Sequence, residues 1–386
     1  MSNHTRQEHA KQEYGQTYVA RPLGTIDMLA RETERLRRVL PAELGALKST
    51  NSFSLLGGQK SDRPPELSRV TGADHSAWNV QSSGSIVRGL LGTDGMRLSR
   101  EEIAAAGRGA TRAAPFQPAW VEARPTPLSS LVPRERNLRR INGKRLRPHG
   151  YVFGNDDRQP FYPSGYPWHC VGKLLVWTDP SSPSPQSTGT GTLVGPNLVL
   201  TAGHMAPWGS DPWMMQFIPA YYNGASILGA GVYSYVQSYR GNSGADSKAW
   251  DHLLLKLYDP IGSSIGWMGT RTYNDDWEDN NVWTLVGYPG AVAGANQPSW
   301  QGGISFHDDD GDGDAMELET DNGDSSPGDS GGPFFAQWDD GPHIVGVDSG
   351  GEEEYQFPFS SQQNNIAAGG KAIVDLVLWG QANWPS

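Results

Sequence analysis

The chain has 386 residues, 48 glycines, 28 prolines and 19% charged residues, which allows a large core and favours a turn-rich β protein over a helical one. The net charge is −11, and it is unevenly spread: residues 1–147 hold 24 of the 31 basic and 14 of the 42 acidic residues, so residues 148–386 hold 7 basic and 28 acidic residues. The acidic half argues against a nucleic-acid partner, because phosphate binding needs clustered lysine and arginine.

Cysteine content and hydropathy say little about location. The single cysteine, Cys170, excludes an intramolecular disulfide. No apolar run approaches the roughly 18 residues that span a bilayer, and the first residues form no apolar signal-peptide segment. The chain therefore stays in the cell, leaves it by another route, or truly starts elsewhere. We expect a secreted, extracellular monomer without a membrane span.

The first 147 residues show little periodicity. Ile26, Leu29, Leu36 and Leu40 recur at roughly helical spacing, which predicts one amphipathic helix near residues 25–40. The remainder, rich in Pro, Gly, Ser and Arg, predicts a largely irregular segment. We interpret residues 1–147 as an N-terminal pro-segment whose positive charge attracts the acidic remainder of the chain.

A basic tract, RERNLRRINGKRLRPHG (134–150), ends this segment with six arginines and one lysine. Exposed tracts of this kind are typical cleavage or hinge sites. We expect processing between residues 134 and 152, which would make the chain a zymogen. A solvated linker that is never cut is the alternative.

The hydrophobic pattern of the sequence changes after Tyr151. Short apolar runs, bounded by Gly, Pro, Asn and Ser, appear at 170–177, 192–203, 252–258, 281–288 and 343–347. Runs of this length and composition predict an all-β, antiparallel sandwich or barrel. The apolar face of 371–381 predicts a C-terminal helix packed on it.

The segment Gly-Asp-Ser-Gly-Gly-Pro (328–333) contains the candidate nucleophile, Ser330. A serine hydroxyl is a weak nucleophile unless a base takes its proton, and the base is most often histidine. His204 follows a strand pattern and three small residues that leave room around the ring. A lone histidine there would be more typical of a surface or core position, so the hypothesis depends on both motifs together.

A third group must orient the imidazole and stabilise its charged form. Asp251 opens the apolar strand WDHLLLKLY and is our candidate, whereas Asp246 and Asp259 lie in turn-like sequences. The chain order His204, Asp251, Ser330 is that of the chymotrypsin type. The alternative is an α/β-hydrolase, whose Gly-x-Ser-x-Gly motif residues 328–332 also fit. That fold needs a helix after the serine, followed by an acid and a histidine well downstream, and the sequence does not show this arrangement.

Four motifs resemble trypsin-like serine proteases of the chymotrypsin fold: TAGH (201–204), WDHLLLKL (250–257), GDSGGP (328–333) and, as the start of the mature enzyme, YVFGNDDR (151–158). The likeness is to the disulfide-poor branch that includes glutamyl endopeptidases, and it covers about 236 residues. It implies two six-stranded antiparallel β-barrels with a C-terminal helix over 148–386. Nothing comparable covers residues 1–147.

The resemblance also assigns roles around the serine. Glycine at position 328 lets the turn aim the N–H groups of Gly328 and Ser330 at one spot, which the resemblance identifies as the oxyanion hole. Asp329 matches the residue that pairs with a newly released N-terminus in trypsin-like enzymes, although the glutamyl branch often has asparagine there. Asp324 matches the base of the specificity pocket, where aspartate selects Lys or Arg; a structural acid is the alternative.

The pocket wall departs from the glutamyl pattern. Asp348 stands where glutamate-selecting relatives have a histidine, and two acids would repel an acidic side chain. Ser349, Gly350 and Gly351 match the segment that pairs with extended substrate backbone. We therefore expect a preference for Arg or Lys at the cleaved bond, with glutamyl-type specificity as the alternative.

An acidic segment, HDDDGDGDAMELE (307–319), fits the calcium-loop pattern with Asp308, Asp310 and Asp312 as ligands. The flanks predict strand and loop instead of two helices, and an acidic solvated loop is the alternative. Any ion there would be structural, so we expect no catalytic cofactor.

These observations predict a serine endopeptidase that acts on protein or peptide substrates through an acyl-enzyme. Two other functions stay open: a protease-shaped binding module without activity, and an esterase that uses the same triad.

Overall fold

The computed structural model describes residues 89–107, 109–124, 150–356 and 360–384, and as strands also 66–71, 77–82 and 144–147. The helix expected near residues 25–40 lies outside the described residues. In the described part of the chain, no helix is long and apolar enough to cross a membrane.

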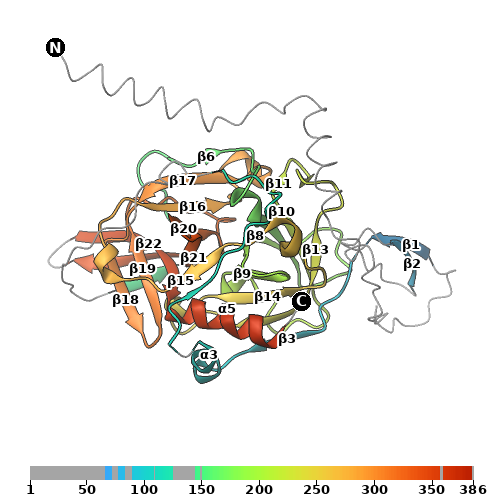
Figure 1. Cartoon of the computed structure of the whole chain (residues 1–386), viewed down its shortest axis with the longest axis horizontal. Coiled ribbons are helices and arrows are strands. Elements are labelled where there is room, and N and C mark those ends of the chain that lie inside the picture. The colour runs from blue at the N-terminus through green and yellow to red at the C-terminus, as the bar shows by residue number, and fades with distance from the viewer. Residues whose placement is uncertain are drawn as a thin grey trace, which may run out of the picture.

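Six antiparallel strands close into a barrel (Figure 1). They are β7 (Val171–Trp177), β8 (Ser187–Leu193), β9 (Leu198–Thr201), β10 (Met214–Pro219), β13 (Ser234–Gly241) and β14 (Leu253–Leu257). The order is β10-β7-β8-β9-β14-β13, and pairing of β10 with β13 closes the ring. The apolar runs of the sequence fill the interior: Leu174, Leu200, Phe217 and Leu255 are fully buried.

A second sheet has its main strands in the order β18-β19-β22-β21-β20-β16-β17-β6. Their bounds are β6 (Gln159–Pro160), β16 (Trp283–Gly287), β17 (Ser299–Ile304), β18 (Asp308–Asp312), β19 (Ala315–Thr320), β20 (Pro333–Trp338), β21 (Gly341–Gln356) and β22 (Ser360–Gly370). Three further strands join it: β4 (Arg112–Ala113) pairs with β15 (Gly269–Arg271), and β15 and β5 (Lys144–Arg147) pair with β21. The core of this sheet is aromatic, with Trp283, Phe306 and Phe334 fully buried.

The helices are few and short. They are α3 (Arg100–Ala106), α4 (Gly262–Ile265), α5 (Lys371–Asn383) and the 3₁₀ turns η2 (Trp168–Cys170), η3 (Gly203–Met205), η4 (Lys248–Trp250), η5 (Asp275–Trp277) and η6 (Ala293–Ala295). Helix α5 buries Ile373, Leu376 and Val377, so the C-terminal helix predicted from the sequence is confirmed. Two small hairpins, β1 (Glu66–Thr71) with β2 (Ala77–Ser82) and β11 (Tyr221–Tyr222) with β12 (Ala225–Ser226), complete the described elements.

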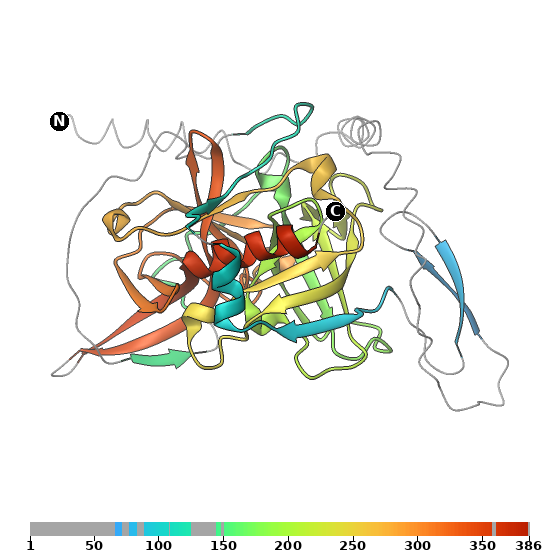
Figure 2. The ribbon, with the colours of Figure 1, turned by 60° about the horizontal axis from the view of Figure 1, so that its bottom comes forward.

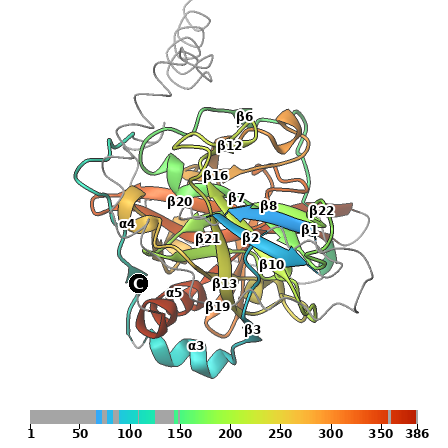
Figure 3. The same cartoon turned by 90° about the vertical axis from the view of Figure 1, so that its right-hand side faces the viewer.

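Part of the predicted pro-segment is built into the domain. Strand β3 (Asp94–Arg97) lies parallel to β13 at the edge of the first barrel, and α3 lies beside α5 (Figures 1, 2 and 3). Leu90 and Leu91 are buried against Met214 and Tyr235. The all-β fold is confirmed, but the described residues 89–124 are more ordered than an irregular segment.

Candidate active site

The Asp251 carboxylate holds His204 at two points. Oδ2 lies 2.7 Å from the ring Nδ1, and Oδ1 accepts the backbone N–H of His204 at 2.7 Å. Asp251 is fully buried, whereas the His204 side chain is 32% exposed. The geometry thus fixes the imidazole by one nitrogen and leaves its other edge accessible.

Two paired strands and the turns beside them position the side chains of His204 and Asp251. His204 lies in η3, directly after β9, and Asp251 ends η4, directly before β14; β9 and β14 are paired neighbours. A side chain at position 203 would collide with the backbone of Asn242, so the close approach requires glycine there. Burial opposes ionisation of Asp251, but its hydrogen bonds from His204 and the nearby charge of Lys248 hold its pKa below the ordinary value.

The turn that carries Ser330 is tied to the strands that lead to His204. Thr190 in β8 makes two of these hydrogen bonds. Its N–H donates to the carbonyl of Ser330 at 2.9 Å, and its hydroxyl donates to the carbonyl of Gly328 at 2.8 Å. A Cβ on Gly331 would lie 2.8 Å from the backbone N of Ala202, two residues before His204. Gly331 has φ +81°, so a side chain there would be strained as well as crowded.

The serine turn leaves two amides out of its own hydrogen bonds. The N–H groups of Asp329, Gly331 and Gly332 donate to the carbonyls of Ser326, Asp348 and Asp329. Those of Gly328 and Ser330 donate to no acceptor within the described residues, and Gly328 has φ +111°. Two amides flanking Asp329 are thus available for a ligand, as the oxyanion-hole prediction requires.

The hydroxyl of Ser330 and the imidazole of His204 make no hydrogen bond to each other in the described part of the chain. Nucleophile and base are often farther apart than hydrogen-bond distance before substrate binds. The contacts of Thr190 and Gly331 place the two segments side by side.

Asp329 is bound by an internal arginine. It is fully buried, and Arg158 Nη1 donates to its Oδ2, while Ser326 N donates to the same oxygen at 3.1 Å. Burial raises the pKa of Asp329 to about 7, and the adjacent Arg158 guanidinium opposes the rise. The sequence predicted no role for Arg158, although it is the last residue of the motif YVFGNDDR (151–158).

Asp324 lies beneath the segment that begins at Tyr151. Its Oδ1 accepts the N–H of Phe153 at 2.8 Å, and its Oδ2 accepts that of Asp157 at 2.7 Å. The residue is 1% exposed, and burial raises its pKa. These contacts give Asp324 a structural role in holding residues 153–157.

Asp348 is also buried beside the serine turn. Its Oδ2 accepts the hydroxyl of Ser325 at 2.9 Å, whereas Oδ1 has no hydrogen-bond partner within the described residues. Burial, together with the negative charge of Asp329, raises the pKa of Asp348 well above its usual range.

Ser349 makes a contact that the sequence did not indicate. Its hydroxyl donates to Asp251 Oδ2, the oxygen that also faces the His204 ring. A donor on that oxygen stabilises the ionised carboxylate. The serine in the predicted substrate strand therefore also supports the aspartate.

The strand predicted to pair with substrate continues into a stretch that is already paired. In β21, Gly351 is opposite Arg147 and Glu354 is opposite Lys144, in antiparallel register with β5. Figure 2 shows β5 as a short green arrow beside the orange strands β21 and β22. Backbone of the basic tract thus lies on the edge that directly follows Ser349.

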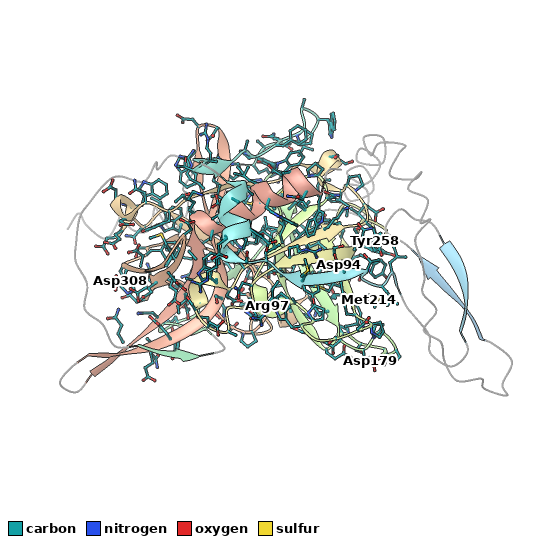
Figure 4. All side chains as sticks on the ribbon, turned by 90° about the horizontal axis from the view of Figure 1, so that it is seen from below. Asp94, Arg97, Asp179, Met214, Tyr258 and Asp308 are labelled. Carbon is teal, nitrogen blue, oxygen red and sulfur yellow. The ribbon has the colours of Figure 1, made fainter. Side chains whose placement is uncertain are left out.

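The acidic segment contains strand β18. Asp308, Asp310 and Asp312 lie in β18, paired with β19, and Asp312 binds Arg100 at 2.7 Å. Of the described acidic residues, Glu278, Asp308 and Asp309 have carboxylate oxygens within 4.8 Å of one another. Asp308 lies on the side of the molecule away from Met214 and Tyr258 of the first barrel (Figure 4).

Comparisons with known proteins found similarity to one family and to individual proteins. The sequence model of the trypsin family matches residues 168–358. An extracellular metalloprotease of Bacillus subtilis (strain 168) is 28% identical over 143 residues, which are 36% of this chain and 44% of the relative, so the chain spans less than half of that protein. A solved structure, a Glu endopeptidase in complex with MPD, aligns with TM-score 0.46 and 18% identity over 60% of this chain and 99% of that one.

The family match extends from η2 through the segments that carry His204, Asp251 and Ser330. It covers the closed six-stranded barrel and most of the second sheet, up to β21. Over residues 168–358 the chain therefore matches the trypsin family, and its fold is that of a chymotrypsin-type protease.

Proposed function

We propose that the protein is a serine endopeptidase with the triad His204, Asp251 and Ser330. The observation that carries the proposal is the double contact of the Asp251 carboxylate with the backbone and ring of His204, at 2.7 Å each. This contact fixes the tautomer in which Nδ1 carries the proton and the other ring nitrogen is the base.

In the first half of the reaction, Ser330 Oγ attacks the carbonyl carbon of the peptide bond while the free ring nitrogen of His204 takes its proton. The negative oxygen that forms is bound by the N–H groups of Gly328 and Ser330, and Asp251 stabilises the imidazolium. The C–N bond then breaks, and the leaving amine takes the proton from His204. An ester of Ser330 remains.

In the second half, His204 takes a proton from water as the water oxygen attacks the ester carbon. The tetrahedral intermediate uses the same two amides. Its collapse releases the carboxylic acid product and returns the proton to Ser330 Oγ. The cycle needs only groups that this chain supplies.

We further propose that the N-terminal region restrains the enzyme by occupying the substrate edge. Support comes from the pairing of β5 with Gly351–Glu354, where an extended peptide bound to Ser349–Gly351 would continue. Cleavage in the basic tract would free this edge. The attraction between the basic segment and the acidic domain would weaken with salt over a Debye length of about 8 Å. We expect the protein to act outside the cell as a monomer.

Preference for Arg or Lys at the cleaved bond stays our proposal for Asp324. Each of its oxygens accepts one amide, and a carboxylate oxygen has a second lone pair for a basic side chain. The calcium hypothesis for Asp308, Asp310 and Asp312 also stays a proposal, for a structural ion only.

A fluorophosphonate probe tests the proposed function directly, because only an activated serine reacts with it. Labelling of the wild type, its loss in Ser330→Ala, and cleavage of a peptide would support the endopeptidase. Absence of labelling in a folded chain would favour a binding module. Hydrolysis of ester but not of matched amide substrates would favour an esterase.

A further inference from the structure

Arg158 is buried behind the serine turn with every nitrogen of its guanidinium group engaged. Its side chain is 1% exposed. Nε and Nη2 bind the two oxygens of Asp156 at 2.9 and 2.7 Å, and Nη1 binds the hydroxyl of Ser326 at 2.8 Å and Asp329 Oδ2. A planar guanidinium group that is held by one carboxylate, that of Asp156, is well suited to fix the position of a second carboxylate, that of Asp329.

These contacts close a ring around the turn that carries the two free amides. Ser326 donates its N–H to Asp329 Oδ2 at 3.1 Å, and Asp329 donates its own to the carbonyl of Ser326 at 3.0 Å. Arg158 contacts both residues. Gly328 and Ser330, whose amides are the predicted oxyanion donors, flank Asp329 on either side. The orientation of both donors therefore depends on where the Asp329 carboxylate is held.

Trypsin-like enzymes bind the matching aspartate with an ammonium that proteolysis creates, but here an internal cation is already in that position. The rest of the carboxylate is enclosed: Oδ1 packs so closely on Gly287 that a Cβ there would overlap it. Two further charges act on Asp329, those of Asp156 and Asp348, and both are negative.

The segment that brings Arg158 to this place is itself anchored. Tyr151 N donates to Asn365 Oδ1 at 2.6 Å, and Ser325 N donates to the carbonyl of Tyr151 at 2.8 Å. The amides of Phe153 and Asp157 donate to Asp324. Residues 151–158 are thus in place in the uncleaved chain.

We propose that Arg158 is a positioning residue that holds the oxyanion turn through Asp329, so that the turn forms without a free N-terminal ammonium. The inference rests on the proposed serine protease function. Processing in the basic tract would then open the substrate edge without being needed to form the catalytic turn.

Substitution of Arg158 tests the first half of this proposal. Arg158→Met leaves a buried carboxylate without its cation, and we expect kcat to fall about 10²-fold, as when an oxyanion donor is lost, with KM changed less than about threefold. Arg158→Lys should recover part of kcat, because an ammonium reaches one carboxylate but lacks the fork. Methylguanidinium added to Arg158→Met should raise kcat in a saturable way.

A matched control is Arg240→Met, which removes another buried arginine, one that binds Asp94 of β3 and lies in the first barrel. It should lower thermal stability and leave kcat close to the wild-type value. If Arg158→Met and Arg240→Met have equal kcat and differ only in stability, Arg158 is structural and the proposal is wrong.

Acetylation of the α-amine tests the second half. At about pH 7 the α-amine, with an ordinary pKa near 8, reacts ahead of lysine. The active species should keep its kcat when mass spectrometry shows the terminus fully acetylated. Loss of activity in step with acetylation would overturn the proposal. Failure of the proposed function is separate, because then the wild type itself would not react with fluorophosphonate.

Discussion

The carboxylate of Asp251 meets His204 twice, at the backbone N–H and at ring Nδ1, both at 2.7 Å. The two contacts fix the position of the ring and its tautomer together. A fully buried aspartate can do this because a third donor, the Ser349 hydroxyl, contacts the oxygen that faces the ring.

Asp251→Asn should leave the fold intact and lower kcat about 10⁴-fold, because an amide can hold the ring in the wrong tautomer. The measurement is kcat at several pH values on a peptide substrate, with circular dichroism to check folding. Asp259→Asn is the control: its carboxylate binds Ser234, and kcat should stay near that of the wild type. Equal activity of wild type and Asp251→Asn would rule out this triad.

Ser349→Ala should lower kcat by about 10- to 100-fold, because a hydrogen bond to a charged group contributes about 1.5–3 kcal/mol. KM should also rise modestly if the strand binds substrate. Ser264→Ala is a matched control, since this serine is buried in α4 and its hydroxyl has no partner among the described residues. If both variants behave alike, the Ser349 hydroxyl does not support Asp251.

Asp324→Asn should lower kcat/KM for a peptide ending in arginine about tenfold more than for one ending in phenylalanine, because the charge that attracts a basic side chain is lost. Matched peptides ending in Arg, Lys, Glu and Phe provide the measurement. The amide oxygen can still accept one of the two backbone N–H groups, so folding is expected to survive. A loss that is equal for all four peptides would show that Asp324 only holds residues 153–157.

Asp348→Asn should stabilise the protein at alkaline pH relative to the wild type. The folded pKa of Asp348 is raised well above the usual value by burial and by Asp329, so its neutral form is favoured in the fold. Its contribution to stability is present below the unfolded pKa of about 3.9 and is lost as pH rises through the folded pKa. The difference in Tm, variant minus wild type, should therefore grow with pH; a difference independent of pH would contradict this.

Chelation should leave catalysis intact. The proposed cycle uses no metal, whereas the Bacillus relative bears the name of a metalloprotease. EDTA should therefore not lower the rate of fluorophosphonate labelling, and any effect should be on Tm if calcium binds Asp308, Asp310 and Asp312. Loss of labelling at a temperature where the protein stays folded would point to metal-dependent activity instead.

An uncleaved chain should react with small probes but not with long peptides. Replacing the basic residues of 134–147 by glutamine blocks basic-specific cleavage while the backbone pairing of β5 with β21 can persist. Because Arg158 already holds the serine turn, fluorophosphonate should label this chain at close to the rate of the processed enzyme. Peptides that extend several residues before the cleaved bond should be cleaved slowly. Rapid cleavage of long peptides would show that β5 does not block the edge.

Much of the domain could be predicted from local patterns. Short apolar runs between turn residues predicted the antiparallel strands, and the apolar face of 371–381 predicted α5. The helix α3 was missed, although Ser99 and Glu102 form a capping box that is visible as Ser-x-x-Glu. Strand β3 could not be predicted in the same way, since its four residues are exposed and form no apolar run, and they pair with β13 through the backbone and the contact of Asp94 with Arg240.

The sequence by itself determined the fold class and the three candidate catalytic residues, because strand period, turn glycines and short motifs are local properties of the chain. Only the tertiary structure decided which charges meet in the interior. Arg158 reaches Asp329 across 171 positions, and Ser349 reaches Asp251 across 98. Such pairs follow from the demand that each buried charge find a partner, and the order of residues does not state which partner the folded chain will bring.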